Sequence, residues 1–264
     1  MAQGVAQRHP FNQPARDIEY FDIFNIVIVY GDFAGYSLIA IGLGRILGFD
    51  FGVNFKRPYF AVNFSDFWRR WHISLSSWLR DYLYIPLGGN KKGSIATYRN
   101  LFTTMLLGGL WHGASWNFVI WGGLHGLYLS VERFLGFNKT NPKTDSFFAR
   151  RIFKIGYMFL VFCLVSFAWI FFRAENINVA QNFIQGLIVS QGGFFFKGKA
   201  VQLIILALIC LLVVANDFVE ERSRKQMLYE KWWNKYYLIW LVVVFFALLI
   251  FGKFNNAAFI YFQF

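Results

Sequence analysis

The sequence predicts an all-α membrane protein that crosses the bilayer several times. Of its 264 residues, 57% are hydrophobic and only 15% are charged, which is not the composition of a water-soluble domain. Long apolar runs alternate with segments rich in lysine and arginine, as in polytopic membrane proteins. We expect a single domain over residues 1–264 with about four transmembrane helices, one broken or re-entrant hairpin and an interfacial amphipathic helix.

Four apolar runs are long enough to cross a bilayer, because a helix needs about 20 apolar residues to span the hydrocarbon layer. The runs at 155–172, 200–216 and 236–252 contain no Asp, Glu, Lys or Arg. A fourth run, 23–47, has Asp32 near its centre. A carboxylate at that depth is costly, so Asp32 indicates a functional site or a buried partner.

Residues 100–131 form a further stretch of 32 residues without Asp, Glu, Lys or Arg. This length is too great for one span and too small for two spans and a turn. Glycines 108, 109 and 113 predict a break in the helix, and His112 lies at that break. Non-helical backbone at membrane depth is tolerated only where protein or a water-filled cavity surrounds it. We therefore expect a re-entrant hairpin.

An amphipathic pattern between Asn63 and Pro86 predicts one helix lying in the membrane interface. Ser65 is the expected N-cap, and Pro86, followed by two glycines, ends the helix. The other face of this helix is charged. The apolar face carries Phe67, Trp71, Leu75, Trp78, Leu79 and Tyr82.

The net charge of +12, from 26 Lys+Arg against 14 Asp+Glu, follows the positive-inside rule, because the basic residues lie between the apolar runs. The basic segments 56–99 and 132–154 should both be cytoplasmic. We expect anionic lipid or an acidic partner at this face, and no nucleic acid. Cys163 and Cys210 both lie in apolar runs, so no disulfide framework or thiolate metal site is expected.

Histidine is the residue type best suited to catalysis here, because imidazole titrates near neutral pH and can take a proton from a hydroxyl. The chain has four, at 9, 72, 112 and 125. His112 and His72 are the candidates for a general base or nucleophile, and the alternative for each is a histidine hydrogen-bonded across helices. For His125 packing is the preferred interpretation, and His9 receives no role.

Other catalytic arrangements are weaker. A triad of Ser74, His72 and Asp81 is rejected, because no nucleophile elbow of the G-x-S-x-G kind is present. A zinc site built from three histidines lacks H-x-x-x-H spacing and thiolates, so no metal is expected. The glycine-rich run at 88–93 lacks the GKS or GKT ending of a phosphate-binding loop and is interpreted as a basic cytoplasmic turn.

Three segments carry a resemblance to a known family: DFWRRWHISLS at 66–76, RDYLYIPLGGN at 80–90 and GLWHGASW at 109–116. With them the chain resembles the membrane-bound O-acyltransferases, in the bacterial branch that acylates alginate and lipoteichoic acid. The resemblance begins near Tyr20. Family members have further spans before that point, so we expect this chain to correspond to a C-terminal portion. It departs from the family at Leu38, which replaces an acidic residue.

The resemblance implies a catalytic mechanism for two of the histidines. His112 matches the essential histidine of the family and would act as the base, and His72 matches the second active-site histidine and would orient the donor carbonyl or the thioester. Hydrogen bonds to substrate could come from several side chains. The substrate-binding residues that we expect are Trp71, Trp111, Asn117 and Asp32.

The resemblance also implies the substrates and the location. The donor would be acetyl-CoA or an acyl carrier protein thioester on the cytoplasmic side, with no permanently bound cofactor. The acceptor would be a hydroxyl of an extracytoplasmic polysaccharide, reached directly or through a separate extracytoplasmic acyltransferase. We expect a multi-pass protein of the bacterial cytoplasmic (inner) membrane. The alternatives are a catalytically inactive, truncated scaffold of an acylation complex and a transporter, for which the sequence lacks an internal repeat.

Overall fold

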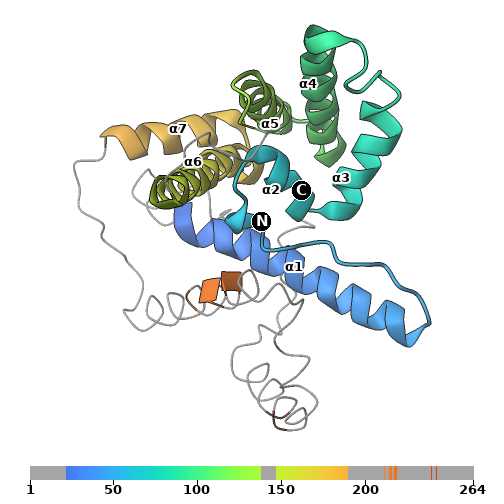
Figure 1. The fold of residues 1–264 in the computed structure, drawn as a ribbon. Helices are drawn as coiled ribbons and strands as arrows, with labels where there is room; N and C mark the ends of the chain where they lie inside the picture. The colour runs from blue at the N-terminus through green and yellow to red at the C-terminus, as the bar shows by residue number, and fades with distance from the viewer. Residues whose placement is uncertain are drawn as a thin grey trace, which may run out of the picture. The chain divides into compact units, whose positions relative to one another are not determined.

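The computed structural model describes residues 22–137 and 147–189, with isolated positions at 211, 214, 215, 217, 218, 239 and 242. The chain divides into two compact units, Met1–Leu203 and Ile204–Phe264. All the regular secondary structure in the described residues is helical (Figure 1), which confirms the all-α prediction. The predicted spans at 200–216 and 236–252 lie outside the described residues, apart from those isolated positions.

The first predicted span is a helix, α1 (Asp22–Ile46). It ends where Gly48 adopts a φ of 85°, a left-handed conformation that glycine enters without steric cost. The amides of Gly48 and Phe49 turn back to the carbonyls of Arg45 and Gly44, at 3.1 and 2.8 Å. Helix α1 therefore ends in a hydrogen-bonded turn in which Gly48 occupies the left-handed position.

The predicted interfacial helix is broken, so the expectation of one continuous helix is wrong. The structure has α2 (Phe64–Arg70), α3 (Ile73–Leu79) and a π-helical turn, η3 (Arg80–Tyr84). Between α2 and α3, Trp71 is extended and His72 is left-handed. The chain then turns at glycines 88 and 89, both with positive φ, which is where the predicted helix was expected to end.

A segment from earlier in the chain explains the break. The carbonyl of Arg70 accepts a hydrogen bond from the amide of Lys56 at 2.8 Å, and the amide of Ile73 donates to the carbonyl of Asn54 at 2.9 Å. Backbone groups that would otherwise continue the helix are thus satisfied by this neighbouring segment, which removes the usual cost of interrupting a helix.

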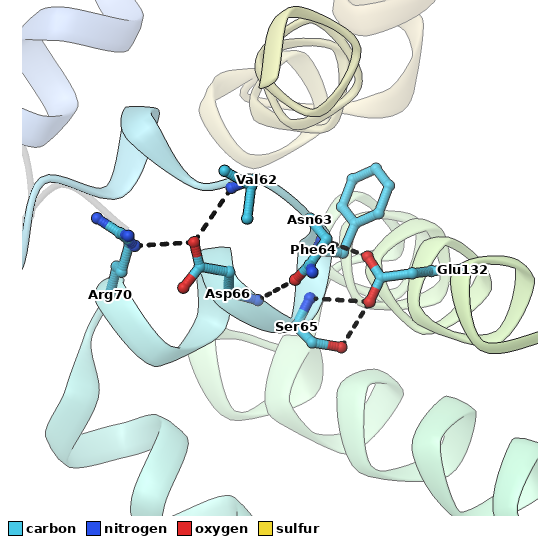
Figure 2. A network of polar contacts seen from close by, with 7 residues as sticks. All are labelled: Val62, Asn63, Phe64, Ser65, Asp66, Arg70 and Glu132. Atoms are coloured by element: carbon cyan, nitrogen blue, oxygen red, sulfur yellow. Dashed lines mark hydrogen bonds and ion pairs between the residues drawn. The ribbon is translucent and has the colours of Figure 1, made fainter. Parts of the chain in front are cut away.

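The N-cap of α2 is Asn63, and the prediction of Ser65 was wrong. The Asn63 side-chain oxygen accepts a hydrogen bond from the Asp66 amide at 2.6 Å. Ser65 instead binds Glu132, which comes from the far end of the helix α5 (Trp116–Phe134). The Glu132 carboxylate accepts hydrogen bonds from the amides of Phe64 and Ser65 and, at 2.6 Å, from the Ser65 hydroxyl (Figure 2). The carboxylate thereby satisfies amides at the positive end of α2 and fixes α2 against α5.

The predicted hairpin at 100–131 is present as α4 (Gly93–His112) followed by α5. The break covers residues 113–115, whereas Gly108 and Gly109 are helical. The two latter glycines are buried in α4, and Gly109 allows a close approach to α5. A Cβ built on Gly109 would lie 2.2 Å from the carbonyl oxygen of Phe118.

The predicted span at 155–172 lies inside α6 (Phe147–Arg173). Among the described helices, one segment is long and apolar enough to cross a membrane, Arg151–Arg173. Helix α6 packs against both α1 and α5, and Val165 and Ala168 on it are fully buried. It is followed by α7 (Ile177–Val189), a helix that we did not predict.

Candidate active site at His72 and His112

His72 has an uncommon backbone conformation at the start of α3. Its φ of 43° and ψ of 57° are left-handed, and Arg57 is the other non-glycine residue with positive φ in the described part of the chain. Such a conformation costs on the order of 1–3 kcal/mol, and residues that adopt it cluster at functional sites. The surrounding structure therefore holds His72 in place at a cost in stability.

The His72 ring lies between α1 and the segment before α2. Its Nδ1 atom is 3.3 Å from Asn54 Oδ1 and 3.3 Å from Ser74 Oγ. Phe33 of α1 meets the ring edge-on, with ring centroids 4.8 Å apart, and Phe55 lies at 6.5 Å. One ring nitrogen is thus engaged by polar groups and the ring itself by aromatic side chains.

His112 is the last residue of α4 and is half-buried among aromatic side chains. Ring centroids lie 4.9 Å away for Phe172, 5.0 Å for Trp111 and 5.3 Å for Trp121. Phe172 comes from α6 and Trp121 from α5. Helices α5 and α6 therefore each pack an aromatic side chain against the His112 ring.

A chain of aromatic contacts connects the two histidines. Trp71, next to His72, lies 4.9 Å from Trp169, and Trp169 lies 5.1 Å from Phe172, which touches His112. Burial, together with the electrostatic influence of His112, lowers the pKa of His72 to about 4. The two imidazoles thus border one aromatic cluster, and His72 is neutral at physiological pH.

Two polar side chains of α5 lie at the His112 turn. The Asn117 amide nitrogen donates to the carbonyl of Ala174 at 2.6 Å, just beyond the end of α6, while its side-chain oxygen is buried with no hydrogen-bond partner among the described residues. The indole N–H of Trp121 is likewise buried and unpartnered in that part of the chain. Buried donors without partners are uncommon, and the Trp121 ring lies against His112, so its N–H is a candidate hydrogen-bond donor at this site.

The remaining predicted substrate-binding residues occupy different surroundings. Trp71 is buried (3% exposed) and Trp111 is mostly exposed (60%) beside His112. Asp32 lies on α1, one residue before Phe33, partly exposed and without a hydrogen bond or ion pair to any described residue. The structure thus gathers Trp71, Trp111 and both catalytic candidates around one aromatic cluster.

The rejected alternatives gain no support from the geometry. Ser74 does contact His72, but the Asp81 carboxylate is bound to the Arg80 side chain at 2.7 Å and lies in an exposed turn. His125 is fully buried, and Trp68 and Trp121 lie 5.0 and 4.9 Å from its ring. This is the packed environment that we expected for it. Within residues 22–137 and 147–189, no three His, Cys, Asp or Glu side chains are grouped to hold a metal ion.

Sequence reasoning missed Asn54, Trp121, Trp169 and Phe172. Asn54 lies 18 residues before His72 in a loop, and no local pattern marks it as part of a site. The three aromatic residues come from α5 and α6, whose sequences are rich in aromatic side chains throughout. Only their packing in the folded protein distinguishes these three residues from the other aromatic residues of α5 and α6.

Comparison with known proteins places these residues in a family. The model of the membrane-bound O-acyltransferase family matches residues 23–174. A probable alginate O-acetylase of Pseudomonas putida is 57% identical over 152 residues, which are 58% of this chain and 30% of that protein. The peptidoglycan O-acetyltransferase of Helicobacter pylori is 44% identical over 164 residues, or 62% of this chain and 30% of that protein.

A more distant relative is the teichoic acid D-alanyltransferase of Streptococcus thermophilus, 33% identical over 143 residues, or 50% of this chain and 32% of that protein. The chain thus spans about a third of the length of these relatives. The matched region, 23–174, contains both histidines and the helices around them. The chain belongs to the membrane-bound O-acyltransferase family.

Proposed function

We propose that this protein is a membrane-embedded O-acyltransferase that moves an acyl group, with acetyl as the first candidate, from a cytoplasmic thioester toward a hydroxyl of an extracytoplasmic polysaccharide. The observation that carries the proposal is the pairing of His72 and His112 at one aromatic-lined site. The alginate and peptidoglycan acetylases among its relatives support a polysaccharide acceptor.

The proposed reaction assigns each group one task. His112 removes the proton of the acceptor hydroxyl, and the resulting oxygen attacks the thioester carbonyl. A tetrahedral intermediate forms and collapses with loss of the thiolate, which takes the proton held by His112. The buried N–H of Trp121, beside His112, is the candidate donor to the oxyanion. His72, which stays neutral, orients the donor by accepting a hydrogen bond from an N–H or O–H group of that molecule at the ring nitrogen left free.

The remaining predicted substrate contacts are part of the same proposal. Trp71 and Trp111 border the aromatic cluster and can line the path of the acyl group. Asn117 keeps one amide oxygen without a protein partner among the described residues, which suits a hydroxyl donor. Asp32, partly exposed on α1 close to Phe33, is the candidate polar contact for the substrate at the His72 end.

In the membrane, we propose a multi-pass protein of the bacterial cytoplasmic (inner) membrane with about four spans, the α4–α5 hairpin and the broken α2–α3 segment at the interface. Lys91 and Lys92 are exposed just before α4, and His112 is at its other end, about 30 Å away by the rise of the helix. These cations can attract an anionic donor or lipid headgroups to the cytoplasmic face, but they are too far to contact the reacting thioester.

The test is acetyl incorporation into cell-envelope polysaccharide by the whole protein in its native membrane. His112→Ala should abolish incorporation while the membrane abundance of the protein stays normal. His9→Ala is the matched control, because no role is assigned to His9, and it should retain activity. Full acetylation by the His112→Ala protein would refute the proposal. If only deletion of the whole protein stops acetylation, a scaffold for a separate acyltransferase explains the result better.

A further inference from the structure

We infer that Asn54 is a positioning residue that fixes the tautomer of His72, keeping the ring proton on Nδ1 and leaving the lone pair on Nε2, where it can accept a hydrogen bond. This inference rests on the proposed function, in which His72 is part of the active site. It concerns a residue outside the three segments that carry the family resemblance, in the loop between α1 and α2.

The orientation of the Asn54 amide follows from its backbone partner. The Ser74 amide lies 3.1 Å from Asn54 Oδ1, and a backbone N–H can only donate. The atom that faces Ser74 and His72 must therefore be the amide oxygen. The amide nitrogen of Asn54 lies on the other side, where it donates to the hydroxyl of Ser37 on α1 at 3.4 Å.

The position of the proton on His72 follows in turn. The Ser74 hydroxyl donates to Asn54 Oδ1 at 3.0 Å, so its hydrogen is not directed at His72. Asn54 Oδ1, 3.3 Å from His72 Nδ1, can only accept from it, and Ser74 Oγ, also at 3.3 Å, accepts as well when its own hydrogen is on Asn54. An imidazole nitrogen facing two acceptors carries a hydrogen, and in the neutral ring the other nitrogen then has the lone pair.

Asn54 is itself held firmly enough to impose this arrangement. Its carbonyl accepts the Ile73 amide at 2.9 Å, and the neighbouring Lys56 amide binds the Arg70 carbonyl at 2.8 Å. The loop is thus attached to the chain on both sides of His72. The left-handed backbone of His72 and its ring orientation are consequently stabilised by the same asparagine.

The geometry makes a specific demand on the side chain at position 54. Asp retains the oxygen acceptor, whereas Leu has a similar size and no polar atom. If the role of Asn54 were only to fill space, Leu would preserve the state of the His72 ring. If its role is to hold the proton, Asp would preserve that state and Leu would not.

The experiment is nitrogen NMR of the whole protein labelled with ¹⁵N-histidine, because protonated and unprotonated ring nitrogens differ widely in chemical shift. The His72→Gln spectrum identifies the His72 signals by their loss. We expect Nδ1–H in the wild type and in Asn54→Asp, and Nε2–H or a mixture in Asn54→Leu. An Nε2–H tautomer in the wild type, or an unchanged Nδ1–H tautomer in Asn54→Leu, would overturn the inference.

Kinetics give the second readout. Loss of the hydrogen-bond partner of a metal-bound histidine typically costs about 10–100-fold in activity, and we expect a loss of that order in kcat for Asn54→Leu. KM for the donor should stay within about threefold, and Asn54→Asp should keep more of the rate than Asn54→Leu. Equal losses in the Leu and Asp variants would count against the inference. Ser74→Ala, which leaves Asn54 Oδ1 in place, should keep the Nδ1–H tautomer. The NMR result does not depend on turnover, so a failure of the acyltransferase proposal would be seen separately, in the His112→Ala assay.

Discussion

A methyl group added at Gly122 should force α4 and α5 apart. A Cβ at this position would lie 2.4 Å from the carbonyl oxygen of Met105 and 3.1 Å from the Cα atom of Leu106. Both are backbone atoms, which cannot rotate away as the end of a side chain can. Ordinary contact begins at 3.4 Å, so the two helices must separate by about 1 Å to accept an alanine.

The expected magnitude combines two opposing effects. Overpacking of a tight contact costs about 1–3 kcal/mol, and replacing a helical glycine by alanine returns up to about 1 kcal/mol. Gly123→Ala is the matched control, because its Cβ would meet only side-chain atoms of Phe102 and Leu106, at 3.8 and 3.9 Å. It receives the same gain in helix propensity without the clash. The two variants should therefore differ by about 2 kcal/mol in stability.

The assay is thermal unfolding of the purified whole protein in detergent, followed by tryptophan fluorescence. A difference of about 2 kcal/mol corresponds to roughly 4–8 °C in apparent Tm for a chain of this size, with Gly122→Ala the lower. Acetylation should fall as well, because Trp121, next to Gly122, borders His112. Equal melting temperatures for Gly122→Ala and Gly123→Ala would show that α4 and α5 do not meet at these glycines.

Three further changes test other parts of the site. Glu132→Gln turns an amide NH₂ toward the N–H donors of α2 and should cost about 1–3 kcal/mol. The Tm of this variant should be lower than that of the exposed Glu175→Gln, and equal Tm values would show that the Glu132 carboxylate does not fix α2 against α5. The pKa of His72 in the folded protein, about 4, is lower than the pKa of roughly 6.5 that histidine has in an unfolded chain. Between these two pH values the unfolded state binds more protons, so the stability of the protein should fall as the pH decreases from 6.5 to 4. An NMR titration midpoint of His72 at or above 6.5 would disprove this. Trp121→Phe removes the indole N–H together with the five-membered ring that carries it, and should lower kcat by about 10²-fold if that N–H stabilises the oxyanion; an unchanged kcat would exclude that role.

The positions of the helices could be predicted wherever hydrophobic composition alone determines where a helix forms. The charge-free run 155–172 became α6, the run around Asp32 became α1, and the stretch that was too long for one span became the α4–α5 hairpin. His112 was placed at the break because glycine marks it. Gly108 and Gly109 misled the prediction, since a glycine that permits close helix packing has the same local signature as a glycine that ends a helix.

The break at His72 could not be predicted from periodicity. The apolar residues of α2 and α3 keep helical spacing across it, so the pattern is that of one helix. What interrupts the helix is hydrogen bonding from Asn54 and Lys56, which come from a loop with no regular pattern of its own. A tertiary contact therefore overrides a correct local signal, and the same contact supplies the partner of the His72 ring.

Helix α5 links the two halves of the candidate site. Near its start, Asn117 binds the carbonyl of Ala174 after α6, and near its end, Glu132 binds the first amides of α2. The first contact sets α6, with Phe172, against His112, and the second sets α2, which leads directly into His72. His112 is the last residue of α4 and His72 comes two residues after α2, so each lies at a helix end, where backbone groups lack partners within the helix. Polar side chains of one helix thus fix the elements around both imidazoles, so loss of either contact should change the distance between the histidines before it unfolds the protein.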